Sequence, residues 1–229
     1  MRLFSTEAVS KYHPDKYADQ ISDAILTECL MQDRQSHCGI ETMIKGNTVV
    51  LGGEITSKAD INYDQIVRRV AKKLGYRADK IINLISEQSP EINRAVLSDE
   101  DIGAGDQGMM FGYATDETPE YMPYPISLAH KLTRQLTKVR KDGTLSYLRP
   151  DGKSQVSVEY DENGKPVRLE AVVLSTQHDE HVSQEQIHED IKKYVFDPIL
   201  PTDMIDADTK FFINPTGRFV IGGPNGDSG

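Results

Sequence analysis

The chain has 229 residues, of which 27% are charged and 38% hydrophobic, a composition typical of one or two globular domains. Its net charge of −10 disfavours nonspecific nucleic-acid binding, which requires basic patches, but it leaves room for a local basic pocket that binds a small polyanion. Two cysteines cannot form a disulfide framework. We find neither a charged-then-apolar leader nor an apolar run of membrane-spanning length. We therefore expect a cytoplasmic protein without nucleic-acid or membrane partners.

The first half of the chain predicts a helix, a hairpin, a second helix and a strand. Pro14 suits the first turn of a helix, because the N–H that proline lacks would have no partner there. A hairpin is predicted from residues 39–44 and 48–56, of which the second segment is rich in β-branched residues. Apolar residues at helical spacing predict an amphipathic helix over 63–74, and residues 81–85 are typical of a short strand.

The second half repeats this order. Residues 88–106 lack a firm period and predict a long loop, and such loops in compact domains are usually functional. A helix is predicted over 128–139, and a hairpin joins 155–160 to 167–177 across Asn163-Gly164. A helix near 183–195 and a strand near 210–214 complete the pattern. A strand–hairpin–helix pattern therefore occurs twice, around 1–85 and 110–215, which predicts an α+β fold with antiparallel pairing rather than alternating βαβ units.

Charged and polar side chains gather where the first helix is predicted to begin. His13, Asp15 and Lys16 lie at the N-terminus of that helix, where the helix dipole and free N–H groups favour anions. His and Lys are donors for phosphate oxygens, and a carboxylate is a ligand for Mg²⁺. The alternative is an ordinary first turn, in which acidic residues are common. Asp19 and Asp23 continue the same helix face, as a solvated acidic stripe or as further metal ligands.

Two carboxylates lie inside otherwise apolar strands. Glu41 and Glu54 interrupt the predicted hairpin, and Glu54 follows two glycines that permit close backbone approach. A buried carboxylate is costly unless it contacts a cation or hydrogen-bond donors, so both residues are candidates for a binding site. The alternative places them on an edge or on a solvent-facing side of the sheet.

The segment Gly103-Ala-Gly-Asp-Gln-Gly108 matches G-x-G-x-x-G, but we reject a dinucleotide site here. Such a site needs a strand before the glycines and a helix after them, and we expect neither a strand at 98–101 nor a helix start at 109–113. Asp106 is therefore interpreted as a polar group at a substrate pocket. The P-loop motif does not occur either.

Further along the chain, Asp151 and Lys153 are predicted in a loop before a strand, as binding residues or as an exposed Pro-Asp-Gly turn. Arg218 and Phe219 precede an apolar segment, and Phe219 is interpreted either as a core residue or as an aromatic platform for a flat ligand.

The other histidines show no spacing that predicts a metal site. His178-Asp-Glu-His181 has the pattern H-x-x-H without further ligands, and we expect it at the surface. Cys29 and Cys38 are interpreted as packing residues.

Five segments of the chain, in order, resemble the signatures of S-adenosylmethionine synthetase (methionine adenosyltransferase). They are residues 4–16, 103–112, 149–156, 172–178 and 211–227. The resemblance implies three sheet-plus-helix units around a pseudo-threefold axis, of which this chain holds two. It predicts an N-terminal domain over 1–100, a central domain over 101–222, and the start of a C-terminal domain at 223–229.

The resemblance also implies functional residues. The ATP-binding residues would be His13, also catalytic, with Lys16, Asp151, Gly152, Lys153, Arg218, Phe219 and Asp227. The methionine-binding residues would be Glu54, Gln88, Asp106 and Asp227, and the loop that begins at Gln88 would be the gate over the active site. Asp15 would bind Mg²⁺ and Glu41 K⁺. The partners implied are ATP and L-methionine, in a homodimer or dimer of dimers with active sites at the subunit interface.

The reaction implied is attack of the methionine sulfur on C5′ of ATP, which gives S-adenosylmethionine, and triphosphate is then cleaved to pyrophosphate and phosphate. The sequence departs from the family in two places. Lys11-Tyr12 replace the usual Glu-Gly before the histidine, which changes the local charge by about +2 and places a large ring beside His13. The chain also stops where the family continues into further phosphate-binding residues, and each absent donor typically costs about 10²–10³ in rate. We therefore expect the 229-residue chain alone to be inactive, as a fragment. Alternatives are a non-catalytic partner that regulates or caps a full-length synthetase, or a nucleotide hydrolase.

Overall fold

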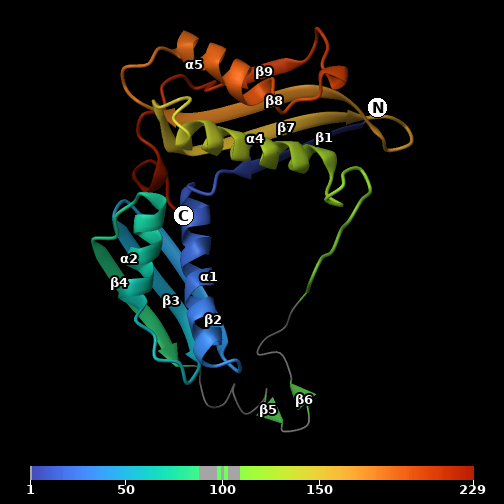
Figure 1. The fold of residues 1–229 in the computed structure, drawn as a ribbon. Helices are drawn as coiled ribbons and strands as arrows, with labels where there is room; N and C mark the ends of the chain where they lie inside the picture. Colours follow the sequence, from blue (N-terminus) through green and yellow to red (C-terminus); the bar gives the residue numbers. More distant parts are fainter. Residues whose placement is uncertain (1, 88–96, 99–100, 103–108) are drawn as a thin grey trace. The chain divides into compact units, whose positions relative to one another are not determined.

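The computed structural model describes residues 2–87, 97–98, 101–102 and 109–229 (Figure 1). These residues form two compact units, which we describe separately. One unit contains the N-terminal residues up to Lys16 together with Ala114–Asp227, and we call it the central unit. The other contains the described part of Tyr17–Tyr113 with Ser228–Gly229, and we call it the N-terminal unit. In the part of the chain that is described, no helix is long and apolar enough to cross a membrane.

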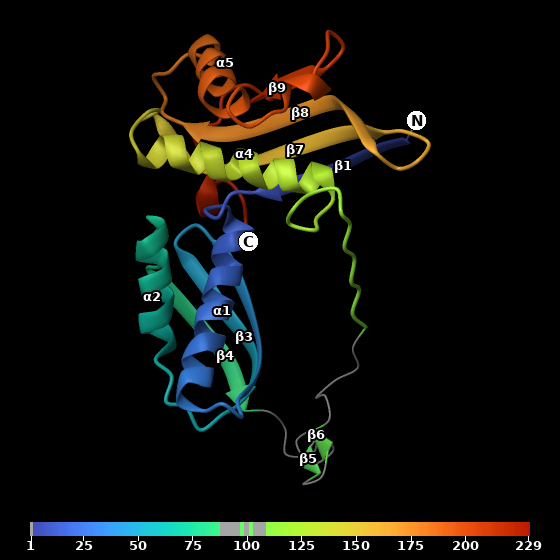
Figure 2. The same ribbon diagram turned by 45° about the vertical axis from the view of Figure 1, so that its right-hand side comes forward.

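The N-terminal unit is a three-stranded sheet covered on one face by two helices (Figures 1 and 2). Its elements are α1 (Pro14–Gln32, whose first turn belongs to the central unit), β2 (His37–Lys45), β3 (Thr48–Thr56), α2 (Tyr63–Leu74) and β4 (Lys80–Glu87). The sheet order is β2-β3-β4. Ile21 and Ile25 of α1 are completely inaccessible, and so is Val67 on the face of α2 that the apolar spacing predicted.

Local signals set the ends of α2 and the approach of β2 to β3. The Asn62 side chain accepts a hydrogen bond from the N–H of Gln65, and Gly75 ends the helix in the left-handed conformation with φ of 79°. Gly53 has a φ of 115°, and a Cβ on it would lie 1.9 Å from the carbonyl oxygen of Gly39. Only glycine allows this approach of the two backbones.

The central unit is a four-stranded sheet with the order β1-β7-β8-β9. Its elements are β1 (Arg2–Val9), α4 (Tyr124–Lys141), β7 (Leu148–Tyr160), β8 (Pro166–His178), α5 (Gln184–Ile191) with a π-helical turn at Lys192–Phe196, short 3₁₀ turns at Thr202–Met204 and Gly223–Asn225, and β9 (Lys210–Ile213). Residues of α4, α5 and the strands share one hydrophobic core, and Gln135 of α4 donates a hydrogen bond to the carbonyl of Tyr194.

The two units repeat one order of elements: a helix, a hairpin, a second helix and a last strand. In the N-terminal unit these are α1, β2-β3, α2 and β4, and in the central unit they are α4, β7-β8, α5 and β9. The repeated sheet-plus-helix units of the α+β prediction are therefore present. The prediction of antiparallel pairing was incomplete, because β4 pairs parallel to β3 and β9 parallel to β8. In each case the intervening helix carries the chain back along the sheet, so that the last strand runs in the same direction as the one before the helix.

Other predictions are corrected by strand pairing. Asp151–Lys153 lie within β7 and not in a loop before it, because Lys153 pairs with Val9 of β1 and with Ser175 of β8. The ladder to β8 is irregular between Leu148 and Gly152. Leu97–Ser98 (β5) and Asp101–Ile102 (β6) form a small antiparallel pair where we expected no strand, although no helix follows at 109–113.

The N-terminal strand joins a different unit from the one that its sequence position indicates. β1 pairs antiparallel to β7 along its whole length, so packing groups residues 2–16 with the central unit. The predicted boundaries at 100 and 222 follow the order of the sequence and stay a prediction.

Candidate functional site

Nine of the residues predicted to bind ligands lie in the central unit, where the chain leaves β1 and crosses the start of β7. Ser10 anchors this crossing: its N–H donates to the carbonyl oxygen of Gly152 at 2.8 Å, and its hydroxyl donates to that of Pro150 at 3.2 Å. The Ser10 hydroxyl also accepts from the N–H of Tyr12, and the Ser10 carbonyl accepts from the N–H of His13. The segment that carries His13 is therefore held against the strand that carries Asp151.

His13 caps the N-terminus of α1 with its own side chain. Its Nδ1 accepts a hydrogen bond from the N–H of Asp15 at 3.2 Å. The Asp15 carboxylate lies 3.5 Å from the same nitrogen, a longer contact that would require Nδ1 to be protonated. The shorter capping bond favours the neutral imidazole with its proton on Nε2. The His13 ring therefore presents an Nε2–H donor, while the Asp15 carboxylate stays exposed to solvent.

Asp151 is a buried acid with an incomplete set of partners. The residue is 4% exposed, and its Oδ2 accepts a hydrogen bond from the N–H of Gly223 at 2.7 Å. Its Oδ1 is buried and has no hydrogen-bond partner among the described residues. Burial raises the pKa of Asp151; the Gly223 bond and the nearby His13 oppose this rise, and the charge of Asp227 adds to it. A buried carboxylate oxygen without a partner among the described residues, close to a histidine and a second acid, indicates a candidate ligand site.

Gly152 permits the close packing that positions Asp151. A Cβ at this position would lie 2.9 Å from the carbonyl oxygen of Ser175 and 3.0 Å from a methyl carbon of Leu136. The neighbouring strand and helix α4 therefore approach β7 at this residue more closely than any side chain would allow. The prediction that Gly152 belongs to the site gains a structural reason, although its contact with a ligand stays a prediction.

His178, which we expected at the surface, is 1% exposed at the end of β8. Its Nε2 accepts from the N–H of Phe219 at 3.0 Å, and its N–H donates to the carbonyl oxygen of Phe219 at 3.0 Å. Its Nδ1 lies 2.8 Å from the carbonyl oxygen of Asp179, which is consistent with a neutral ring protonated on Nδ1. His178 thus fixes the backbone of Phe219, whose ring stays partly accessible. Sequence reasoning missed this residue, because its partner lies 41 residues later.

Gln177 ties the same segment to Asp151. Its Nε2 donates to the carbonyl oxygen of Val220 at 2.9 Å, and its Oε1 lies 3.4 Å from the N–H of Asp151. Asp227 is held nearby through its own N–H, which donates to the carbonyl oxygen of Gly223. The carboxylates of Asp151 and Asp227 and the ring of Phe219 therefore come from one hydrogen-bonded arrangement of β7, the end of β8 and residues 219–227.

The predicted cationic residues are exposed. Lys153 lies 3.9 Å from Glu7, and Arg218 pairs with Glu180 at 2.6 Å, with both side chains of each pair largely in solvent. Such exposed pairs contribute little stability and exchange readily for another anion. Lys16 is also exposed. Burial lowers the pKa of His130, and the charges of Arg134 and Lys16 lower it further.

The remaining predicted residues belong to the N-terminal unit or lie outside the described residues. Glu41 and Glu54 are both exposed on one face of the β2-β3 ladder, since Glu41 pairs with Gly52 and Glu54 pairs with Gly39. The solvent-facing alternative therefore describes them in this chain. Gln88 and Asp106, with most of the predicted gate loop, are not among the described residues.

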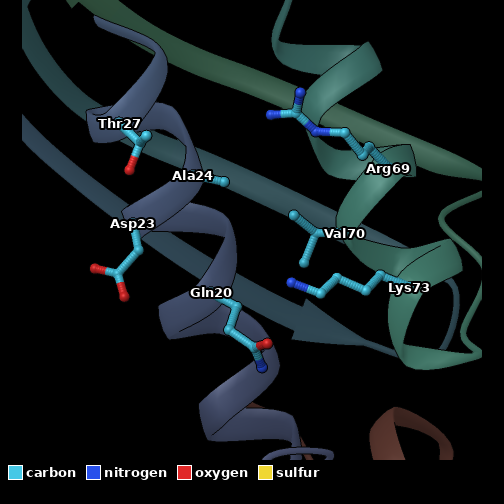
Figure 3. Close-up of a pocket in the computed structure, with 7 residues that line it drawn as sticks. All are labelled: Gln20, Asp23, Ala24, Thr27, Arg69, Val70 and Lys73. Atoms are coloured by element: carbon cyan, nitrogen blue, oxygen red, sulfur yellow. The ribbon is translucent and has the colours of Figure 1, made fainter. Parts of the chain in front are cut away.

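A groove in the N-terminal unit lies between α1 and α2 (Figure 3). It has a volume of about 370 Å³ and is lined by Gln20, Asp23, Ala24, Thr27, Arg69, Val70 and Lys73. Lys73 extends from α2 towards α1 (Figure 3). None of the predicted ATP-binding or methionine-binding residues lines this groove. Asp23 is exposed at its edge, as expected of a solvated acidic stripe.

Metal binding was tested against the side chains available. Within the described residues, no group of three or more His, Cys, Asp or Glu side chains is close enough to hold a metal ion. Mg²⁺ is commonly held by one or two carboxylates together with substrate phosphates and water. The exposed carboxylate of Asp15 fits this limited role, and the exposed carboxylate of Glu41 fits only as one contributor to a K⁺ site.

Comparison with protein-family models gives two matches. Residues 1–96 match the N-terminal domain of S-adenosylmethionine synthetase. Residues 101–219 match the central domain of S-adenosylmethionine synthetase. Together the two matches span most of the chain, in the order in which the two units occur.

Proposed function

The chain belongs to the S-adenosylmethionine synthetase family, and we propose that it contributes the nucleotide-binding part of a methionine adenosyltransferase. The proposed reaction transfers the adenosyl group of ATP to the sulfur of L-methionine, which gives S-adenosylmethionine and triphosphate. Water then hydrolyses the triphosphate to phosphate and pyrophosphate. The observation that carries the proposal is the buried Asp151, which interacts electrostatically with His13 and Asp227 and whose Oδ1 has no hydrogen-bond partner in the part of the chain that is described. A solvated surface acid would show neither feature.

The proposed reaction needs no protein nucleophile. A lone pair of the methionine sulfur forms the bond to C5′, and the electron pair of the breaking C5′–O bond leaves with triphosphate. The protein must then align three atoms and neutralise a highly charged leaving group. We assign the Nε2–H of His13 and the ammonium groups of Lys16 and Lys153 to the triphosphate. Arg218 would exchange its exposed partner Glu180 for a phosphate oxygen.

The nucleoside and methionine would be bound by the segments that flank this cluster. Phe219 presents a partly accessible ring on a backbone fixed by His178, which suits stacking against adenine. Asp151 and Gly152 complete the ATP contacts in the proposal, and Asp227 would serve both substrates. Glu54, Gln88 and Asp106 are proposed methionine contacts by resemblance alone. Mg²⁺ at Asp15 and K⁺ at Glu41 would supply positive charge that offsets the charge of the leaving triphosphate.

The proposed assembly is a homodimer or a dimer of such dimers. It is supported by the face of the N-terminal sheet that the helices leave uncovered, where Met43 is 57% exposed and Leu84 65% exposed. Met43 pairs with Val50, and Leu84 pairs with Gly52, so these exposed apolar side chains lie on the two outer strands of one sheet face, which also carries the exposed Glu41 and Glu54. Exposed apolar side chains gathered on one face favour an interface between subunits. It would serve equally for the alternative role, in which the chain caps or regulates a full-length synthetase. The cytoplasmic location is also part of the proposal.

The test combines nucleotide binding with catalysis. Binding of MgATP to the purified 229-residue chain is measured by calorimetry, and S-adenosylmethionine formation is measured with ATP, methionine, Mg²⁺ and K⁺. We expect binding that is weakened at least tenfold by His13→Ala and left unchanged by His181→Ala, a matched exposed histidine. Absence of nucleotide binding would contradict the proposed site. Binding without product, together with co-purification of an intact synthetase, would favour the non-catalytic role.

A further inference from the structure

Tyr12 directly precedes His13 in the sequence. Its side chain is buried, and two cationic groups lie beside its ring. The residue is 3% exposed. The guanidinium carbon of Arg140 lies 4.6 Å from the ring centroid, and the ammonium nitrogen of Lys11 lies 5.2 Å from it. Both distances are within the range of a cation–π interaction. The Tyr12 hydroxyl, in addition, is hydrogen-bonded to the side chain of Lys141.

These contacts connect two elements that are remote in sequence. Arg140 and Lys141 form the C-terminal end of α4, whereas Tyr12 lies in the crossing between β1 and α1. Burial by itself would raise the pKa of the Tyr12 hydroxyl, but the Lys141 hydrogen bond and the charges of Lys11, Arg140 and Lys141 together lower it. The surroundings of the ring are thus arranged to interact with its electrons and its oxygen.

The crossing has little freedom once Tyr12 is anchored. The Ser10 hydroxyl accepts from the N–H of Tyr12, and the Ser10 carbonyl accepts from the N–H of His13. The imidazole of His13 is then used as the cap of α1 through Nδ1. These bonds and the buried Tyr12 side chain together restrict the direction in which the chain leaves Ser10.

We propose that Tyr12 is a positioning residue that anchors residues 10–13 to the end of α4 and thereby holds the His13 imidazole with Nδ1 as acceptor and Nε2–H directed to a phosphate. The phosphate role of His13 rests on the function proposed above; the effect of Tyr12 on the imidazole does not. Arg140 and the other cationic groups hold the Tyr12 ring. We therefore expect Arg140 to influence the tautomer of His13 through Tyr12 and not through a hydrogen bond to His13.

The test records the tautomer of His13 in protein with ¹⁵N-labelled histidine. In the unaltered chain, we expect Nδ1 as acceptor and a proton on Nε2. In Tyr12→Leu, which removes the ring electrons and the hydroxyl, we expect both tautomers of His13. Tyr12→Phe should give an intermediate result, because it keeps the ring but loses the bond to Lys141. Tyr194→Leu is the matched control. The ammonium nitrogen of Lys193 lies 4.8 Å from the centroid of the Tyr194 ring, which is not part of residues 10–13.

A second pair of variants keeps the test independent of changes at Tyr12. Arg140→Gln removes the closer cation and should change the tautomer of His13 in the same direction as Tyr12→Phe. Arg140→Lys should restore most of the tautomer preference of the unaltered chain. An unchanged His13 tautomer in both Tyr12→Leu and Arg140→Gln would overturn the proposal.

Binding of inorganic tripolyphosphate separates this proposal from the proposed function. If both hold, Tyr12→Leu weakens binding about tenfold or more, in parallel with the tautomer change. If the tautomer changes but no form of the chain binds tripolyphosphate, the positioning role of Tyr12 is supported and the phosphate site at His13 is refuted.

Discussion

The carboxylate of Asp151 is joined to the backbone of Gly223, 72 residues away, by a hydrogen bond of 2.7 Å from the N–H of Gly223 to Oδ2. This bond fixes the segment that follows Phe219 against β7. It satisfies one oxygen of a buried acid, while the other oxygen has no hydrogen-bond partner within residues 2–87 and 109–229 or the short described segments between them. The same residue is therefore both a structural link and the strongest indication of a ligand site.

Asp151→Asn should change how stability depends on pH. Burial raises the pKa of Asp151 in the folded chain, so the folded state binds more protons than the unfolded state above the unfolded pKa of about 3.9. The contribution of Asp151 is fully present below that value and is lost as pH rises through the raised pKa. We expect the asparagine variant to avoid this loss, so that near pH 7 it is more stable by about 1 kcal/mol, while nucleotide binding is lost.

Urea unfolding of both proteins between pH 4 and pH 7 measures this difference. Asp161→Asn is the control of opposite sign, because hydrogen bonds from Lys165 and Asn163 lower the pKa of Asp161 at the exposed turn. The contribution of Asp161 is present above the unfolded pKa and is lost as pH falls. A destabilisation by Asp151→Asn that is the same at every pH would show that the buried acid carries no ionisation cost.

Gly152→Ala should destabilise the central unit. The added Cβ would lie 2.9 Å from the carbonyl oxygen of Ser175 and 3.0 Å from the Leu136 side chain, and backbone cannot move away as easily as a side chain. We expect a loss of about 1–3 kcal/mol in the free energy of unfolding, as for other overpacked positions. Gly52→Ala is the control, since it also lies in a strand and its Cβ would meet nothing within 4 Å. Equal stabilities of the two variants would contradict the close approach at Gly152.

Elements whose ends are set by local sequence signals could be predicted from the sequence. Apolar spacing and Gly75 were sufficient for α2, and Asn163-Gly164 was sufficient for the β7-β8 hairpin. Pairing between distant segments was not predictable in the same way. Nothing in residues 2–9 indicates that they pair with β7. The turn-like Pro150-Asp-Gly152 lies within β7, where Gly152 pairs with Thr176 of β8 and accepts a hydrogen bond from the N–H of Ser10.

In the candidate site, too, local motifs were predictable and contacts between distant segments were not. The residue types at His13 and Asp151 were recognisable from their motifs, but the burial of Asp151 depends on Gly223 and on the segment that follows it. His178 was expected at the surface because its H-x-x-H pattern has no further metal ligands. Its burial results from the return of Phe219 to the end of β8, a contact that no local pattern encodes.

His178→Ala should destabilise the segment that carries Phe219. The substitution leaves the N–H of Phe219 without its acceptor and removes a buried ring, which we expect to cost about 2–4 kcal/mol in the free energy of unfolding. His181→Ala, three residues away and exposed, should change stability by less than about 0.5 kcal/mol. Hydrogen exchange of the Phe219 amide provides the specific readout, and continued protection in His178→Ala would refute the role of His178.

The two cysteines should differ sharply in reactivity. Burial, together with the neighbouring Cys38, raises the pKa of the Cys29 thiol to about 12, so almost none of it is thiolate at pH 8. Cys38 is partly exposed. We expect a thiol reagent to modify Cys38 within minutes at pH 8 and Cys29 only in urea, with peptide mass spectrometry locating the label. Cys38→Ser should therefore lack fast labelling in the folded chain, whereas Cys29→Ser should keep it. Fast labelling of Cys29 in folded protein would mean that the α1 face opens at this residue.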